Sequence, residues 1–70
     1  MGRDEVFDLL NVMIDNQDDV SLEDLIDFTY QNCSDLSTNN IRDLFSRVNH
    51  KKSKNYNIDH AIKLWIRLRS

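Results

Sequence analysis

Acidic side chains crowd into the stretch from residue 15 to residue 27, where oxygen ligands for a hard cation such as Ca²⁺ could come together. The six residues are Asp15, Asp18, Asp19, Glu23, Asp24 and Asp27. An EF-hand loop needs a glycine at its sixth position and a glutamate at its twelfth. Counted from Asp15, those positions hold Val20 and Ile26, so the spacing excludes an EF-hand. The cluster instead predicts a binding surface for a basic partner.

The cysteine and the histidines form no catalytic or metal-binding pattern. Zinc sites need four nitrogen or sulfur ligands in close pairs, whereas the chain offers Cys33, His50 and His60, none at pair spacing. No glycine-rich loop or oxyanion-stabilising motif accompanies Cys33, which we expect to be buried on an apolar helix face. We therefore expect no enzyme activity, no metal, no cofactor and no small-molecule substrate. A single cysteine also excludes an internal disulfide and suits a reducing compartment.

Charge is divided unequally along the chain. Residues 1–38 hold ten acids and one base, a net charge of 1 − 10 = −9, while residues 39–70 hold eight bases and two acids, a net charge of 8 − 2 = +6. Such an asymmetry bears on partners more than on the fold, because it steers association at long range. The basic residues that could bind DNA or an acidic partner are Arg42, Arg47, Lys51, Lys52 and Lys54.

Residues 21–48 can be read as a helix–turn–helix, which makes direct DNA binding by the basic half the first alternative function. Two observations argue against it. The predicted connection is longer than the usual turn of three or four residues, and the whole chain is acidic, with a pI of about 5.1. A second alternative is self-association, in which the acidic half of one copy meets the basic half of another.

Composition indicates the fold class. The chain has 70 residues, no proline and a single glycine at position 2, which favours helices over a small β protein because β turns depend on both residue types. We predict one all-α domain over residues 1–70, a compact bundle of four short helices at about 4–16, 22–33, 38–50 and 58–69. The acidic start and the short apolar runs predict neither a secretory signal nor a transmembrane helix, so we expect a cytoplasmic protein.

Apolar residues recur at helical spacing in each of the four segments. The predicted inward faces are Val6, Leu9, Leu10, Met13 and Ile14; Leu22, Leu25, Ile26, Thr29 and Cys33; Ile41, Leu44, Phe45 and Val48; and Ile58, Ala61, Ile62, Trp65 and Leu68. Predicted N-caps are Ser21, Ser37 or Thr38, and Asn57. We expect residues 50–57 to form a basic, mobile linker. Trp65 is either a core residue or an exposed anchor for a partner groove.

One resemblance adds to these patterns. The residues that carry it are Ser21-Leu22-Glu23-Asp24-Leu25, Asn32, Leu36-Ser37-Thr38-Asn39-Asn40-Ile41, Leu44-Phe45-Ser46, Asn49-His50-Lys51 and Leu64-Trp65-Ile66-Arg67. Through them, residues 21–51 and a segment around Trp65 resemble the Hha/YmoA family of small nucleoid-associated modulators. Asn49 and Ile26 stand where the family has acidic residues.

The resemblance implies a four-helix protein that does not bind DNA strongly by itself. It implies docking through acidic side chains on the basic dimerisation region of an H-NS-like protein, with altered silencing of target genes. From the residues and the resemblance together we expect a small regulatory interaction module that binds another protein through its acidic side chains.

Overall fold

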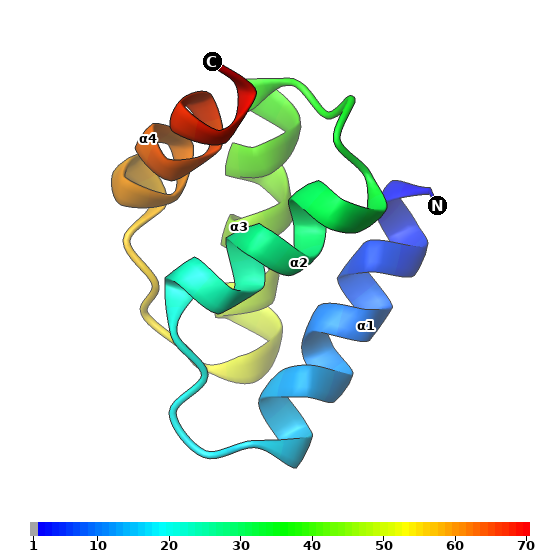
Figure 1. Ribbon diagram of the computed structural model, residues 1–70. Coiled ribbons are helices and arrows are strands. Elements are labelled where there is room, and N and C mark those ends of the chain that lie inside the picture. The colour runs from blue at the N-terminus through cyan, green and yellow to red at the C-terminus, as the bar shows by residue number, and fades with distance from the viewer. Residues whose placement is uncertain (1) are drawn as a thin grey trace.

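Four α-helices, with no strand among residues 2–70, make up the part of the chain that the computed structural model describes (Figure 1). They are α1 (Arg3–Asn16), α2 (Leu22–Asn32), α3 (Thr38–Lys52) and α4 (Ile58–Arg69). The predicted all-α bundle of four short helices is confirmed. No helix in this part of the chain is both long and apolar enough to cross a membrane.

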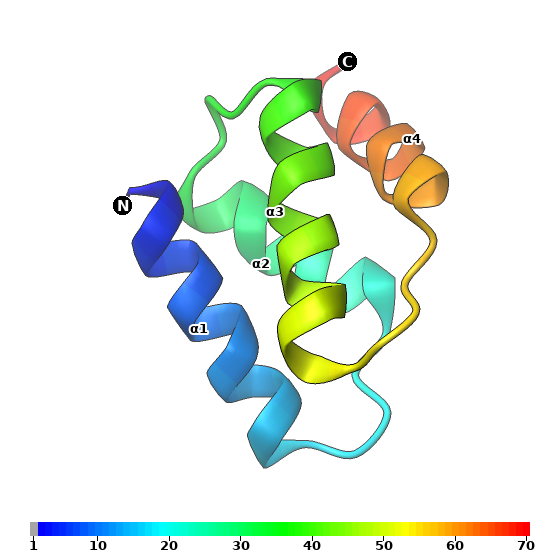
Figure 2. The same cartoon turned by 180° about the vertical axis from the view of Figure 1, so that it is seen from behind.

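The helices form a ring around the core. Helix α3 packs against α1 and α4, and α2 packs against the same two helices. Among residues 2–70, no Cα pair between α2 and α3 lies within 8 Å, and the same holds for α1 and α4. Both views show α1 and α4 on opposite flanks, with α1 and α3 running in the same direction (Figure 2). The ring therefore places the outer faces of α1 and α4 on opposite sides of the molecule.

The core consists of the inward faces of the four helices and two loop residues. The predicted face of α3 is confirmed, and that of α2 is confirmed except at its last residue, Cys33, which is only partly buried. The buried residues of the two faces are Leu22, Leu25, Ile26, Thr29, Ile41, Leu44, Phe45 and Val48. Two residues outside the helices, Val20 and Leu36, are also buried. On α4, Ala61 and Trp65 are fully buried, whereas Leu68 is 36% exposed. The predicted α4 face is thus correct at its centre and wrong at its C-terminal end, where the helix extends past the core.

The inward face of α1 differs from the predicted one. Leu9 is 37% exposed, while Phe7, which the predicted stripe omitted, is buried at 8% exposure. Val6 and Leu10 lie inward as predicted, and they are joined by the buried Asn11, whose side chain has no hydrogen-bond partner among the described residues. Apolar residues surround most of this helix, so two stripes compete, and the helix turns Phe7 rather than Leu9 toward its neighbours.

Three helices begin at the predicted capping residues. The Ser21 hydroxyl accepts a hydrogen bond from the Asp24 amide, the Ser37 hydroxyl from the Asn40 amide, and the Asn57 side-chain oxygen from the His60 amide. Each cap satisfies a backbone N–H that the first helical turn leaves unpaired, and each is worth about 1 kcal/mol. The two candidates for the third helix are thereby resolved in favour of Ser37.

Helix α3 is longer than predicted at its C-terminal end. It runs through Lys52, so the first residues of the predicted linker at 50–57 belong to the helix. Basic residues in the last turn interact favourably with the negative end of the helix dipole. Ser53 then takes the left-handed conformation with φ 52°, and the Lys54 amide donates to the Asn49 carbonyl at 3.0 Å. This closure resembles the glycine-terminated helix ends of other proteins but uses a serine.

We expect Ser53→Gly to raise the free energy of unfolding by about 0.5–1 kcal/mol, because glycine adopts the left-handed conformation without the steric cost that a Cβ imposes. Urea denaturation followed by circular dichroism measures the change. Ser53→Ala is the control, since it removes the hydroxyl and keeps the Cβ, and it should give no such gain. A loss of stability in the glycine variant would contradict the left-handed closure of α3.

Candidate interaction surface

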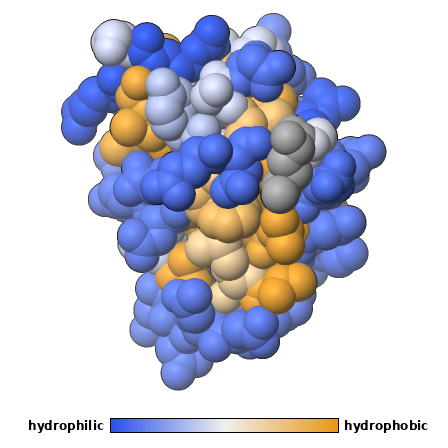
Figure 3. Space-filling model, turned by 45° about the vertical axis from the view of Figure 1, so that its right-hand side comes forward, coloured by the Kyte–Doolittle hydropathy of each residue, from blue (hydrophilic) through white to orange (hydrophobic). Residues whose placement is uncertain are grey.

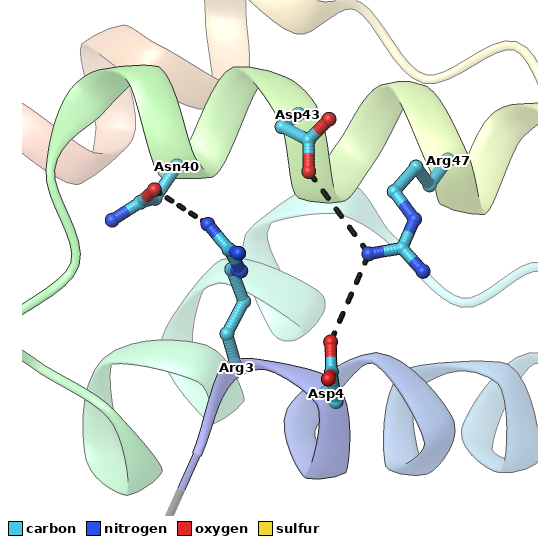
Figure 4. A network of polar contacts seen from close by, with 5 residues as sticks. All are labelled: Arg3, Asp4, Asn40, Asp43 and Arg47. Carbon is cyan, nitrogen blue, oxygen red and sulfur yellow. Dashed lines mark hydrogen bonds and ion pairs between the residues drawn. The ribbon is translucent and has the colours of Figure 1, made fainter.

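Contacts between α1 and α3 bring the acidic half of the chain against the basic half. The guanidinium of Arg47 on α3 lies between two carboxylates (Figure 4). Its Nη1 atom is 3.9 Å from Oδ1 of Asp4 on α1 and 4.0 Å from Oδ2 of Asp43 on its own helix. The Arg3 guanidinium donates to the Asn40 side-chain oxygen at 2.8 Å. These contacts lie at the surface, where such pairs contribute little stability.

The same side of α1 carries Phe7 and Asp15 against α3. The Arg47 guanidinium lies 4.5 Å from the Phe7 ring centroid and the Lys51 ammonium 5.7 Å from it. Near the end of α1, Asp15 pairs with Lys52 at 2.6 Å. Phe7, Arg47 and Lys51 also line a shallow groove of about 450 Å³. Several predicted binding residues of both signs therefore meet each other within this molecule.

The predicted acidic set is divided by these contacts. Asp15 pairs with Lys52, whereas the remaining five carboxylates have no ion pair among residues 2–70 and are all exposed. We call these five the acidic surface: Asp18, Asp19, Glu23, Asp24 and Asp27. Two of them lie in the connection between α1 and α2. On α2 the other three point away from the core, because the buried residues occupy the opposite helical face.

The predicted basic set is divided in the same way. Arg47 and Lys52 form ion pairs with α1, and Lys51 contacts α1 only through the Phe7 ring. Arg42, Lys51 and Lys54 are exposed and have no ion pair within residues 2–70. The helix–turn–helix interpretation fails on geometry. In that motif two helices pack across a turn of three to four residues, but here α2 and α3 lie on opposite sides of the core, joined by residues 33–37.

Trp65 is a core residue, and the exposed-anchor interpretation is wrong. Its side chain is 0% exposed, and its indole N–H donates to the Leu36 carbonyl at 2.9 Å. The Tyr30 ring meets it edge-on, with 5.5 Å between the ring centroids. The Arg69 guanidinium donates to the same Leu36 carbonyl at 3.0 Å. Trp65 thus joins α4 to α2 and to the loop before α3, and a partner cannot reach it in the folded chain.

Asn49 and Tyr56 form a brace between α3 and the loop before α4, which the sequence patterns do not predict. The Asn49 side chain donates to the Tyr56 carbonyl and accepts from the Tyr56 amide, both at 2.9 Å. The Tyr56 hydroxyl donates to the Val20 carbonyl at 2.8 Å, which ties the loop before α4 to the loop between α1 and α2. Burial, and secondarily the charge of Asp19, raises the pKa of the Tyr56 hydroxyl. No periodic pattern signals this brace, because its residues belong to a helix end and to two loops.

The two positions that depart from the Hha/YmoA pattern have different structural roles in this chain. Asn49 holds the loop before α4 through both polar atoms of its side chain. Ile26 is 1% exposed in the core. In this chain both positions therefore serve the fold, and neither presents an acidic group to a partner.

Cys33 ends α2 and is only partly buried, so the predicted fully buried thiol is wrong. Its Sγ lies 3.4 Å from the Asp35 carboxylate oxygen, to which it donates. Burial raises the pKa of the Cys33 thiol, and the hydrogen bond to Asp35 raises it further. A thiol that stays protonated is a poor nucleophile, because the thiolate is the reactive form. Within residues 2–70, no cluster of three His, Cys, Asp or Glu side chains could hold a metal ion.

Comparisons with protein-family models, with curated proteins and with solved structures found no match to this chain.

Proposed function

We propose that this chain is a small regulatory module that binds a basic protein through the acidic surface. The observation that carries the proposal is that these carboxylates are clustered, exposed and, in the part of the chain that the structure describes, without ion pairs. Residues 18–27 contain five acids and no base, all five are exposed, and none is neutralised by an ion pair within residues 2–70. The bundle holds them on a loop and a helix face that are anchored at the Ser21 cap and by the hydrogen bond from Tyr56 to Val20.

The class of partner follows from charge and from the sequence resemblance. Clustered exposed carboxylates accelerate and select encounters with a basic surface more than they add affinity. The resemblance to the Hha/YmoA family supports an H-NS-like nucleoid protein, whose dimerisation region is basic, and hence a role in transcription regulation. Because the family's acids are absent at Asn49 and Ile26, the proposed contacts are those of the acidic surface itself.

We expect an H-NS-like dimerisation domain to form a complex with this chain at low salt. The complex should weaken steeply between about 0.01 M and about 1 M salt, because the Debye length falls from about 30 Å to about 3 Å over that range. Isothermal titration calorimetry at several salt concentrations measures both quantities. Absence of any complex at the lowest salt concentration would refute an H-NS-like partner.

Two matched triple variants distinguish an effect of the acidic surface from an effect of the net charge. Asp18→Asn, Glu23→Gln and Asp27→Asn together should weaken the complex by tenfold or more, which corresponds to about 1.4 kcal/mol. The control removes three other exposed carboxylates, through Asp35→Asn, Asp43→Asn and Asp59→Asn. Both triple variants change the net charge equally, so equal weakening would contradict a role for the acidic surface.

A gel-shift titration tests direct DNA binding. Micromolar binding with a steep salt dependence, lost on substitution of Arg42 and Lys51, would favour DNA over a protein partner. The structure counts against a strong DNA interface, because Arg47 and Lys52 are already engaged with acidic side chains of α1.

A further inference from the structure

The outer face of α1 presents apolar side chains between carboxylates. Leu9 is 37% exposed and Val12 is 50% exposed, and their spacing of three places them side by side on the helix. Glu5 and Asp8 lie on the same outer face, one turn before Leu9 and Val12 respectively. On the side of the molecule that includes α1, apolar surface gathers centrally with hydrophilic residues around it (Figure 3). We call Glu5, Asp8, Leu9 and Val12 the α1 patch.

The outer face of α4 has the opposite charge around an apolar side chain. Ile66 is 52% exposed, the largest exposure among the large apolar side chains of this helix. Lys63 and Arg67 are both exposed. Lys63 is three residues from Ile66 and four from Arg67, so it neighbours both on the helix surface. Helix α4 carries three bases and one acid, 3 − 1 = +2, whereas α1 carries one base and four acids, 1 − 4 = −3. We call Lys63, Ile66 and Arg67 the α4 patch.

We propose that the α1 patch of one copy binds the α4 patch of a second copy. A contact between two like patches is unfavourable, because it brings the carboxylates of one copy close to those of the other. The α1 patch and the α4 patch are complementary, because apolar side chains would meet apolar side chains and acidic groups would meet basic groups. The four charged residues Glu5, Asp8, Lys63 and Arg67 have no ion pair within residues 2–70, so contacts inside the molecule do not neutralise them.

The fold determines what this contact builds. Because α1 and α4 lie on opposite flanks of the ring (Figures 1 and 2), each molecule can bind one neighbour through α1 and another through α4. Such a head-to-tail contact generates rings or open chains rather than a closed dimer. This assembly does not depend on the acidic surface and is therefore separate from the function proposed above.

Sedimentation equilibrium of the purified chain tests the assembly. At about 0.01 M salt, the weight-average mass should rise with concentration and pass beyond that of a dimer, and at about 1 M salt it should fall toward the monomer. A monomer at every concentration, or a dimer that grows no further, would overturn the proposal.

Charge exchange identifies the surfaces. We expect Lys63→Glu to weaken association by about tenfold, because it places like charges against each other. Adding Asp8→Lys should restore association, since the charges are then exchanged across the same contact. The control is Lys54→Glu, which changes the net charge equally in the loop before α4. If Lys54→Glu weakens association as much as Lys63→Glu, or if the double variant does not recover, these two patches are not the interface.

Discussion

We expect Trp65→Ala to leave the chain largely unfolded at 25 °C. Trp65 is fully buried, packs against Tyr30 and hydrogen-bonds the Leu36 carbonyl. Truncating a buried tryptophan to alanine costs about 3–5 kcal/mol. That loss is comparable to the whole stability of a domain of this length, at about 0.05–0.15 kcal/mol per residue. Far-UV circular dichroism and a thermal melt measure the result.

Two further variants make this expectation specific. Trp65→Phe keeps most of the aromatic contact and leaves Arg69 as a donor to the Leu36 carbonyl, so it should fold with a smaller loss of stability. Ile66→Ala changes the neighbouring, half-exposed residue and should alter stability by only a fraction of the loss at Trp65. If Trp65→Ala melted like the original chain, the burial of Trp65 described above would be refuted.

The second large effect is expected at Asn49. Replacing it by alanine removes two hydrogen bonds and leaves the Tyr56 amide and carbonyl unpaired in a partly buried place. Each lost bond contributes about 0.5–1.5 kcal/mol, so Asn49→Ala should lower the free energy of unfolding by about 2 kcal/mol. Urea denaturation of the variant against the original chain measures the difference.

The adjacent residue provides the control for Asn49. His50 is exposed in the same helical turn, and His50→Ala should change stability by less than about 0.5 kcal/mol. Tyr56→Phe removes only the hydrogen bond to the Val20 carbonyl, so its loss should fall between those of the other two variants. Equal stability of Asn49→Ala and His50→Ala would show that the brace contributes nothing in solution.

Local sequence patterns were sufficient to predict the four helices. The caps at Ser21, Ser37 and Asn57 and the buried face of α3 were predicted correctly, because a cap is formed within one helical turn and a single apolar stripe has one way to turn inward. The pattern failed on α1, where Phe7 and Leu9 belong to two competing stripes. Choosing between them requires the neighbouring helix, which offers Arg47 and Lys51 to the Phe7 ring.

The sequence by itself determined the fold class, the helix starts and the division of charge between the two halves. The tertiary structure alone decided which charged side chains pair within the molecule and which stay free to bind a partner. It pairs Asp15 with Lys52 and brings Asp4 near Arg47, leaves the acidic surface without ion pairs within residues 2–70, and buries Trp65 against a carbonyl 29 residues away. The physical reason is range: capping and periodicity depend on neighbours within one or two turns, whereas ion pairs and burial depend on which helices pack together.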